Sequence, residues 1–172
     1  LDRMIYDLLD ASRVESGNLA LVREECDVRD LVRATADLFE PTLQTHELVV
    51  ELPTAPVPVS CDPTRIEQVL ANLVTNAVKY SPEGGTVRID IRPLDTAVEI
   101  AVTDTGMGMS PEDVARVFEP FHRAARSAAT VAGLGLGLFV AKKIAKAHDG
   151  DLLVESTVGE GSTFTLRLPR NT

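Results

Sequence analysis

Two asparagines lie one helical turn apart in the segment PTRIEQVLANLVTNAVKY, which covers residues 63–80. Asn72 and Asn76 share a face that borders an apolar stripe. Asparagine is a poor residue for the middle of a helix, because its amide competes for backbone hydrogen bonds. A carboxamide oxygen is a suitable Mg²⁺ ligand, and Lys79 on the same stripe could contact a phosphate. The pattern therefore indicates a metal–phosphate site, and a solvated polar face is the alternative.

Two polar residues stand at the ends of predicted strands. The apolar residues of VEIAVTD alternate, and Asp104 continues their parity, which places a carboxylate on the core side. Gly106 and Gly108 follow, so a flat purine ring could approach bare backbone there; an ordinary turn is the simpler explanation. Ser162 begins the inward face of STFTLRLP in the same way, and by itself it is more typical of a sheet edge.

Three glycines occur at every second position before a predicted helix, namely Gly133, Gly135 and Gly137. The segment lacks the G-x-x-x-x-G-K-[ST] pattern of a P-loop, and no strand precedes it as a dinucleotide-binding fold would require. Two explanations remain, a flexible hinge and a row of backbone N–H groups that face an anion at a helix N-terminus. The spacing alone is weak evidence and leaves both explanations open.

The elements that must position these residues form a mixed pattern of helices and strands. Asp62 followed by proline predicts the start of a helix that reaches about Tyr80. TVRIDIRP and AVEIAVTD alternate like the two strands of a hairpin, and residues 136–148 read as a helix. Because strands and helices do not alternate strictly, we expect an α+β sandwich, a mixed sheet with helices over one face. An apolar stripe before Gly17 predicts part of a bundle helix, with an ordinary surface helix as the alternative.

Composition excludes several classes of partner. The chain has 172 residues and a net charge of −9, with no basic run, which argues against binding nucleic acid. No apolar stretch approaches the roughly 18 residues of a membrane span. The two cysteines, isolated from each other and from histidine, give little support for a disulfide or zinc site, and we expect a cytoplasmic protein. Because the chain begins within a helical pattern, we expect it to be a piece of a longer protein, which could be anchored to a membrane.

Taken in order, five motifs resemble the nucleotide-binding domain of sensor histidine kinases, within the GHKL ATPase superfamily. The five boxes of that family, spread over residues 62–168, correspond to EQVLANLVTNAVKY, DTGMGM, FEPF, GLGLGL and GEGSTF. The segment LLDASRVESGNL is similar to the end of the family's dimerisation and phosphoacceptor domain. The resemblance implies a two-layer α/β sandwich at residues 19–172, preceded by part of a bundle helix at residues 1–18.

The resemblance also implies roles for individual residues. Asn76 would bind Mg²⁺, and Asn72 would stand where ATP hydrolases of the superfamily carry a general-base glutamate, while Lys79 would act with them in catalysis. Phe118 and Phe121 would anchor an ATP lid over roughly residues 119–134. The implied nucleotide-binding residues are Asn76, Lys79, Tyr80, Asp104, Gly106, Gly108, Gly133, Leu134, Gly135, Leu136, Gly137, Leu138 and Ser162.

Two departures from the family pattern bear on function. Leu134 replaces the usual threonine or serine, and none of the three histidines has the sequence context of a phosphoacceptor. We expect His46 to end a helix, His122 to lie in the lid and His148 to close the last helix, each as a surface or capping residue. The acceptor histidine is therefore expected upstream of this chain.

The function implied is transfer of the γ-phosphate of Mg-ATP to a histidine and then to an aspartate of a response regulator. The full phosphoacceptor domain would make a homodimer. Two alternatives remain, an anti-sigma-factor serine kinase and a non-catalytic nucleotide-sensing module of the same fold.

Overall fold

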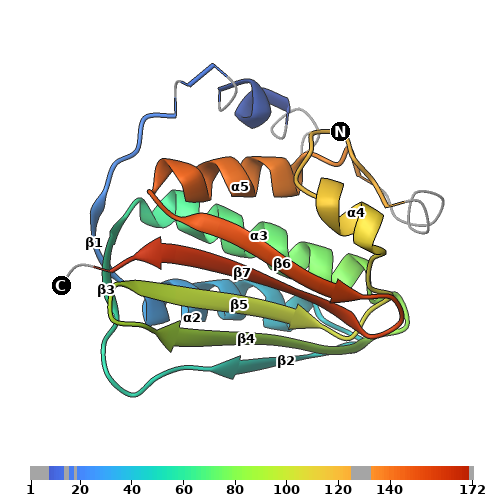
Figure 1. Cartoon of the computed structure of the whole chain (residues 1–172). Coiled ribbons are helices and arrows are strands. Elements are labelled where there is room, and N and C mark those ends of the chain that lie inside the picture. The colour runs from blue at the N-terminus through green and yellow to red at the C-terminus, as the bar shows by residue number, and fades with distance from the viewer. Residues whose placement is uncertain (1–7, 14–15, 18, 125–132, 171–172) are drawn as a thin grey trace.

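A five-stranded mixed sheet forms one layer of the molecule (Figure 1). The computed structural model describes residues 8–13, 16–17, 19–124 and 133–170. The first pair, β2 with β4, is parallel and the other neighbours are antiparallel, which confirms the expected mixed sheet. In spatial order the strands are β2 (His46–Glu51), β4 (Gly85–Pro93), β5 (Ala97–Asp104), β7 (Gly161–Pro169) and β6 (Asp151–Thr157).

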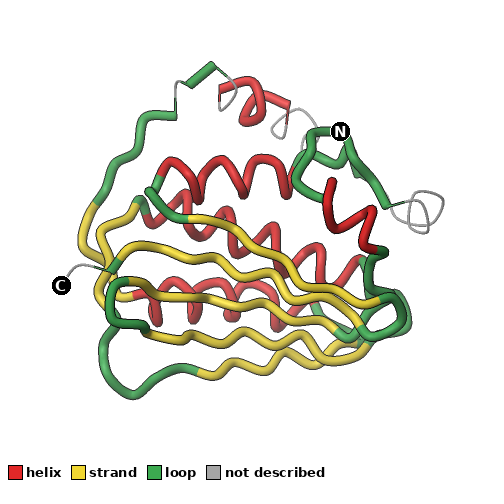
Figure 2. The backbone as a smooth tube through the Cα atoms, viewed as in Figure 1, coloured by secondary structure: helices red, strands yellow, loops and turns green. Residues whose placement is uncertain are grey.

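Helices form the second layer, on one face of the sheet, as Figure 2 shows. A short 3₁₀ turn follows the first of them, and β1 (Glu24–Asp27) pairs with β3 (Pro58–Cys61) in a separate two-stranded ribbon. No helix among the residues that the structure describes has the length and apolar character needed to cross a membrane. The remaining elements are α2 (Val28–Phe39), the 3₁₀ turn Glu40–Thr42, α3 (Pro63–Lys79), α4 (Pro111–Arg116) and α5 (Gly137–Ala147).

The central helix α3 begins where its sequence predicts. The side chain of Asp62 accepts a hydrogen bond from the N–H of Arg65, and Pro63 occupies the first turn. One face of the helix is buried against β4, β5 and the neighbouring helices. Burying side chains of this size stabilises a fold by about 1.5–3 kcal/mol each, so this face alone fixes the helix on the sheet. The buried residues are the predicted ones, Ile66, Val69, Leu70, Leu73, Val74 and Ala77.

The N-terminal region differs in detail from the expectations. Residues 8–13 are helical, and within them Asp10 accepts a hydrogen bond from Gln68 Nε2 at 2.7 Å. Gly17 has a φ of +69°, in keeping with a helix-ending residue, but residues 1–7, 14–15 and 18 lie outside the described part. The division of the chain at residue 18 stays a prediction.

Two assignments of local structure were wrong. The strand expected from about residue 19 begins only at Glu24, because Val22 N–H donates to the Asp62 carboxylate at 2.9 Å instead of to a sheet neighbour. His46 begins β2 and does not end a helix.

Helix α2 ends at Phe39. The chain then makes the 3₁₀ turn that contains Pro41, and proline lacks the N–H needed to continue α2.

Candidate functional site

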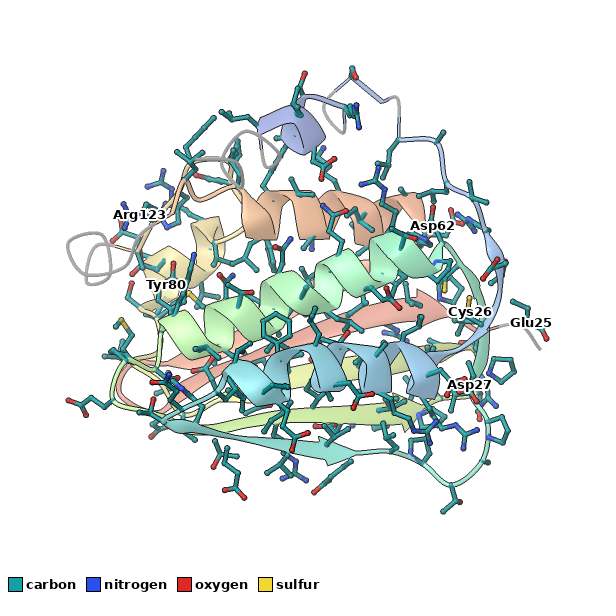
Figure 3. The ribbon with its side chains drawn as sticks, turned by 180° about the vertical axis from the view of Figure 1, so that it is seen from behind. Glu25, Cys26, Asp27, Asp62, Tyr80 and Arg123 are labelled. Atoms are coloured by element: carbon teal, nitrogen blue, oxygen red, sulfur yellow. The ribbon has the colours of Figure 1, made fainter. Side chains whose placement is uncertain are left out.

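A single pocket collects most of the residues that the sequence motifs single out. It lies between α3, the segment that enters α5, and the ends of β5 and β7. Figure 3 shows Tyr80 and Arg123, which line this pocket, at the opposite end of the molecule from Cys26 and Asp62. The predicted residues in its wall are Asn72, Asn76, Lys79, Tyr80, Asp104, Gly108, Gly133, Leu134, Gly135, Leu136, Gly137, Leu138 and Ser162.

One end of the pocket holds a buried carboxylate. Asp104 is 4 % exposed at the end of β5, opposite Ser162 of β7. Burial raises the pKa of the Asp104 carboxyl, and hydrogen bonds from the backbone N–H groups of Gly106 and Ser162 lower it in part. The N–H of Gly106 is 2.9 Å from Asp104 Oδ1. An acceptor oriented in this way, in a desolvated corner, is suited to the exocyclic amine of a base.

The two glycines after Asp104 have different roles. Gly106 does not line the pocket; a Cβ there would clash with the carbonyl oxygen of Tyr80 and lie 2.8 Å from Asp104 Oδ1. The expected role of Gly106 as a wall is therefore corrected to backbone packing behind the carboxylate. Gly108 does line the pocket, with a φ of +63°, and a Cβ there would strike the backbone of Thr157.

Ser162 belongs to a hydroxyl network at the same end. Its Oγ lies 2.8 Å from Ser156 Oγ, which also accepts the N–H of Met109 at 2.8 Å and donates to the carbonyl oxygen of Gly161. Ser156 thus ties β6, β7 and the segment after β5 together. The sequence patterns did not single out Ser156, although its position three residues before the glycine turn at 159–161 could have indicated a pairing with Ser162.

The two asparagines of α3 line the same pocket. Asn72 Nδ2 donates to the carbonyl oxygen of Gly137 at 3.2 Å, so this amide holds the first turn of α5 beside α3. Asn76 lies one turn further along the same face and lines the pocket. A Cβ placed on Gly133 would lie 3.4 Å from Lys79 Nζ, which brings an ammonium group next to the glycine segment.

A divalent cation at Asn76 would be coordinated mainly by water and by the phosphates of a bound substrate, and only in part by the protein. Among the described residues no group of three His, Cys, Asp or Glu side chains could hold a metal ion. An amide oxygen without a carboxylate cage fits Mg²⁺, which usually keeps several waters and is shared with substrate phosphates.

The glycine segment combines two backbone functions. Gly133 and Gly135 have φ angles of +150° and +71°, which L side chains rarely adopt, whereas Gly137 is the first helical residue of α5. A Cβ on Gly135 would lie 2.5 Å from the carbonyl oxygen of His122. Of the intervening leucines, Leu136 is 2 % exposed and packs in the core, while Leu134 and Leu138 are half-buried.

The phenylalanines of FEPF are not equivalent. Phe118 packs edge-on against Phe164, with ring centroids 6.3 Å apart, and Lys142 Nζ lies 4.7 Å from the centre of its ring. The Phe121 side chain is 63 % exposed and its φ is +60°; only its backbone N–H is anchored, on Gly135 O at 3.0 Å. Within the expected lid, residues 125–132 lie outside the described part of the chain.

The histidines are more deeply placed than expected. The His122 side chain is 11 % exposed and lines the pocket, so its assignment as a surface residue was wrong. His148 is the C-cap of α5, as expected, but it is buried and its Nε2 accepts the N–H of Asp62 at 3.0 Å. The other pocket residues that sequence reasoning missed are Thr75, Met107, Met109, Val117, Arg123, Ala124 and Phe164.

Comparison with known proteins places this pocket in a family of ATPases. Residues 61–172 match the model of the histidine kinase-, DNA gyrase B- and HSP90-like ATPase family. Histidine protein kinase DivJ of Caulobacter vibrioides is 36 % identical over 168 residues, covering 96 % of this chain and 28 % of that protein. Sensor-like histidine kinase SenX3 of Mycobacterium tuberculosis is 41 % identical and is matched over 98 % of this chain and 42 % of its own length. The chain therefore spans less than half the length of these relatives.

Solved structures agree with this placement. Full-length ShkA, crystallised in complex with AMPPNP, superposes with a TM-score of 0.86 at 28 % identity, over 99 % of this chain and 36 % of ShkA. The Acinetobacter baumannii histidine kinase AdeS gives a TM-score of 0.79 at 32 % identity, over 99 % of this chain and 79 % of the AdeS chain. The two-layer fold expected from the sequence is thus confirmed.

Proposed function

The chain belongs to the histidine kinase-, DNA gyrase B- and HSP90-like ATPase family, and we propose that it is the catalytic ATP-binding region of a two-component sensor histidine kinase. The observation that carries the proposal is one pocket whose wall combines two kinds of group. A buried acceptor, Asp104, lines it together with the amide of Asn76, the ammonium of Lys79 and the glycine segment. Adenosine triphosphate has the matching polarity, an amine donor on its base and an anionic tail.

The phosphate end contains hydrogen-bond donors and a cation. Lys79 and the backbone before α5 would neutralise and orient the triphosphate, and the N-terminus of an 11-residue helix adds a favourable dipole. Asn76 would hold Mg²⁺, which when bound neutralises charge on the β- and γ-phosphates.

The residues on α3 favour phosphoryl transfer over hydrolysis. Asn72 cannot remove a proton from water, and its amide is already engaged by Gly137 O. The γ-phosphoryl group would instead pass in line to a histidine nitrogen, so that a P–N bond forms as the bond to the β-phosphate oxygen breaks and ADP leaves. Two of the described histidines offer no such acceptor: His46 Nε2 is bonded to Ser81 O, and His148 is buried in the core.

In the complete protein the acceptor histidine and the dimer would come from the phosphoacceptor domain. A response-regulator aspartate would then receive the phosphoryl group, in the cytoplasm. These assignments rest on the names of the relatives, which are a histidine protein kinase and a sensor-like histidine kinase.

Calorimetric titration with Mg-ATP tests the pocket. Replacing Asn76 by Ala should abolish the Mg²⁺-dependent part of the affinity, because the amide oxygen is removed from the metal end. Gln68→Ala is a matched control, since it removes an amide from the same helix outside the pocket. Equal losses in both variants, or none in Asn76→Ala, would contradict the metal assignment.

Phosphoryl transfer needs a second experiment. The chain is mixed with a separately expressed acceptor helical hairpin and ATP labelled at the γ-phosphate. Acid-labile labelling of the hairpin histidine supports the proposal. Labelling of a serine on a partner would indicate a serine kinase, and binding without transfer would indicate a nucleotide-sensing module.

A further inference from the structure

His122 lies between two hollows of the surface. His122 lines the nucleotide pocket and also a second depression beside α4, to which Asp113 and Arg116 contribute. The Nε2 atom is buried and has no hydrogen-bond partner among the described residues; Asp113 Oδ1 is 3.5 Å away. A buried imidazole nitrogen without a partner destabilises a fold, so its presence here calls for a function.

Asp113 is held in position to receive a proton donor. Its Oδ2 accepts a hydrogen bond from Ser110 Oγ at 2.9 Å, and Ser110 Oγ in turn accepts the N–H of Asp113 as the N-cap of α4. The carboxylate is 15 % exposed, so Oδ1 faces His122 in a poorly solvated place. A shift of about half an ångström would make the pair a charge-assisted hydrogen bond if the imidazole carried a proton.

The backbone of His122 is attached to the phosphate end of the pocket. Its carbonyl oxygen lies against Gly135, and the preceding residue, Phe121, donates its N–H to Gly135 O at 3.0 Å. Phe121 adopts a left-handed φ of +60°, which costs about 1 kcal/mol and persists because both contacts hold it. His122 therefore belongs to the same pocket wall as the glycine segment that is expected to meet phosphate.

The charges around His122 come from several elements. In the depression beside α4, the charged side chains of that helix are Glu112, Asp113 and Arg116. Arg123, next to His122 in the chain, lines both the depression and the pocket, and Lys79 of α3 lines the pocket. The Asp104 carboxylate also lines the pocket, so these carboxylates and cations are equal in number. A bound triphosphate adds several negative charges and shifts this balance.

We propose that His122 takes up one proton when the triphosphate binds, donates its Nε2–H to Asp113 and presents its positive charge to the phosphates. This inference rests on the proposed function, since it assumes that the pocket holds ATP. The proton comes from solvent on binding and returns on release. His122 is thus a nucleotide-binding residue, and Asp113 is the residue that positions it. By linkage, affinity for the triphosphate falls as pH rises through the range in which the imidazole loses its proton.

Calorimetry in buffers of different ionisation enthalpy measures the proton uptake directly. Mg-ATP is titrated into the chain at several pH values between about 6 and 8, the range in which histidines change charge. The unmodified chain should take up a larger fraction of a proton than His122→Gln, which keeps an N–H donor for Asp113 but cannot be charged. The dissociation constant of the unmodified chain should rise with pH, by at most about tenfold per unit, more steeply than that of the variant.

Two further variants separate this inference from other effects. Asp113→Asn should reduce the proton uptake, because the imidazolium loses its carboxylate. His46→Gln removes a histidine outside the pocket and should leave the uptake unchanged. Equal proton uptake by the unmodified chain and His122→Gln, with ATP still bound, would overturn the inference alone. Failure of the unmodified chain to bind ATP would refute the proposed function, and the inference with it.

Discussion

Replacing Asp104 by Asn exchanges one oxygen of a buried carboxylate in the pocket for an NH₂ group. The Asn oxygen can keep the hydrogen bond from the Gly106 N–H, now 2.9 Å long, so the NH₂ group takes the place of the other carboxylate oxygen. That oxygen is the acceptor we assign to the adenine amine. In the variant the NH₂ group of Asn would face the amine of adenine, so two hydrogen-bond donors would meet and no hydrogen bond could form. Asp104 is 4 % exposed, so water cannot replace the lost bond.

The size of the effect follows from the charge and burial of Asp104. A hydrogen bond to a charged group contributes about 1.5–3 kcal/mol, which corresponds to a roughly 10- to 150-fold weaker binding of ATP. Inosine triphosphate carries a carbonyl oxygen where ATP has the amine. Asp104→Asn should therefore bind it more tightly than the unmodified chain does, which inverts the preference between the two nucleotides.

Titration calorimetry with both nucleotides gives the two dissociation constants, and thermal unfolding gives the control. Burial raises the pKa of Asp104, so its ionised form is disfavoured in the folded state, and removing the charge should not lower the stability. Unchanged ATP affinity would refute the assignment of Asp104 to the base. A large loss of stability would show that the carboxylate mainly supports the fold.

Three other predictions concern the framework of the site. Phe118→Ala removes a half-buried ring from its contact with Phe164 and should lower the free energy of unfolding by about 1–3 kcal/mol in urea titration; a change under about 0.5 kcal/mol would contradict it. Gly135→Ala places a Cβ on a residue with a φ of +71°, only 2.5 Å from the carbonyl oxygen of His122, so the backbone of the glycine segment must move. ATP affinity should therefore fall at least tenfold by calorimetry. Unchanged affinity would show that the phosphates do not contact this backbone. Burial lowers the pKa of His148, so below about pH 6.5 the unfolded chain binds more protons and stability should fall by at most about 1.4 kcal/mol per pH unit. In His148→Gln this slope, measured by urea titration at several pH values, should flatten, and an unchanged slope would assign it to other groups.

Local signals predicted the central helix well. Asp62 and Pro63 specify the first turn of α3 through a cap and a fixed φ, and the apolar spacing specifies the buried face. Both effects act within a few residues, so they can be read along the chain. For the same reason Asn76 could be singled out before its surroundings were known.

Residues whose environment depends on distant segments could not be assigned in this way. Gly106 and Gly108 share one motif, yet the first packs against Tyr80 O and the second against Thr157. Glycine spacing shows that backbone is approached closely but does not show by what. His122 has the same difficulty, because its burial arises from α4 and from a glycine segment that follows it by more than ten residues.

The position of β7 has a consequence for biosynthesis. This strand is the last along the described chain, yet it lies between β5 and β6 in the sheet. While residues 161–169 remain in the ribosomal tunnel, β5 lacks one neighbour, β6 has no strand to pair with, and neither Ser162 nor Phe164 has reached the pocket. Non-local pairing of this kind folds slowly and exposes unpaired strand edges until it is complete. Nascent chains stalled before residue 161 should therefore depend on chaperones, and a premature stop codon there would yield a protein whose pocket lacks Ser162 and Phe164.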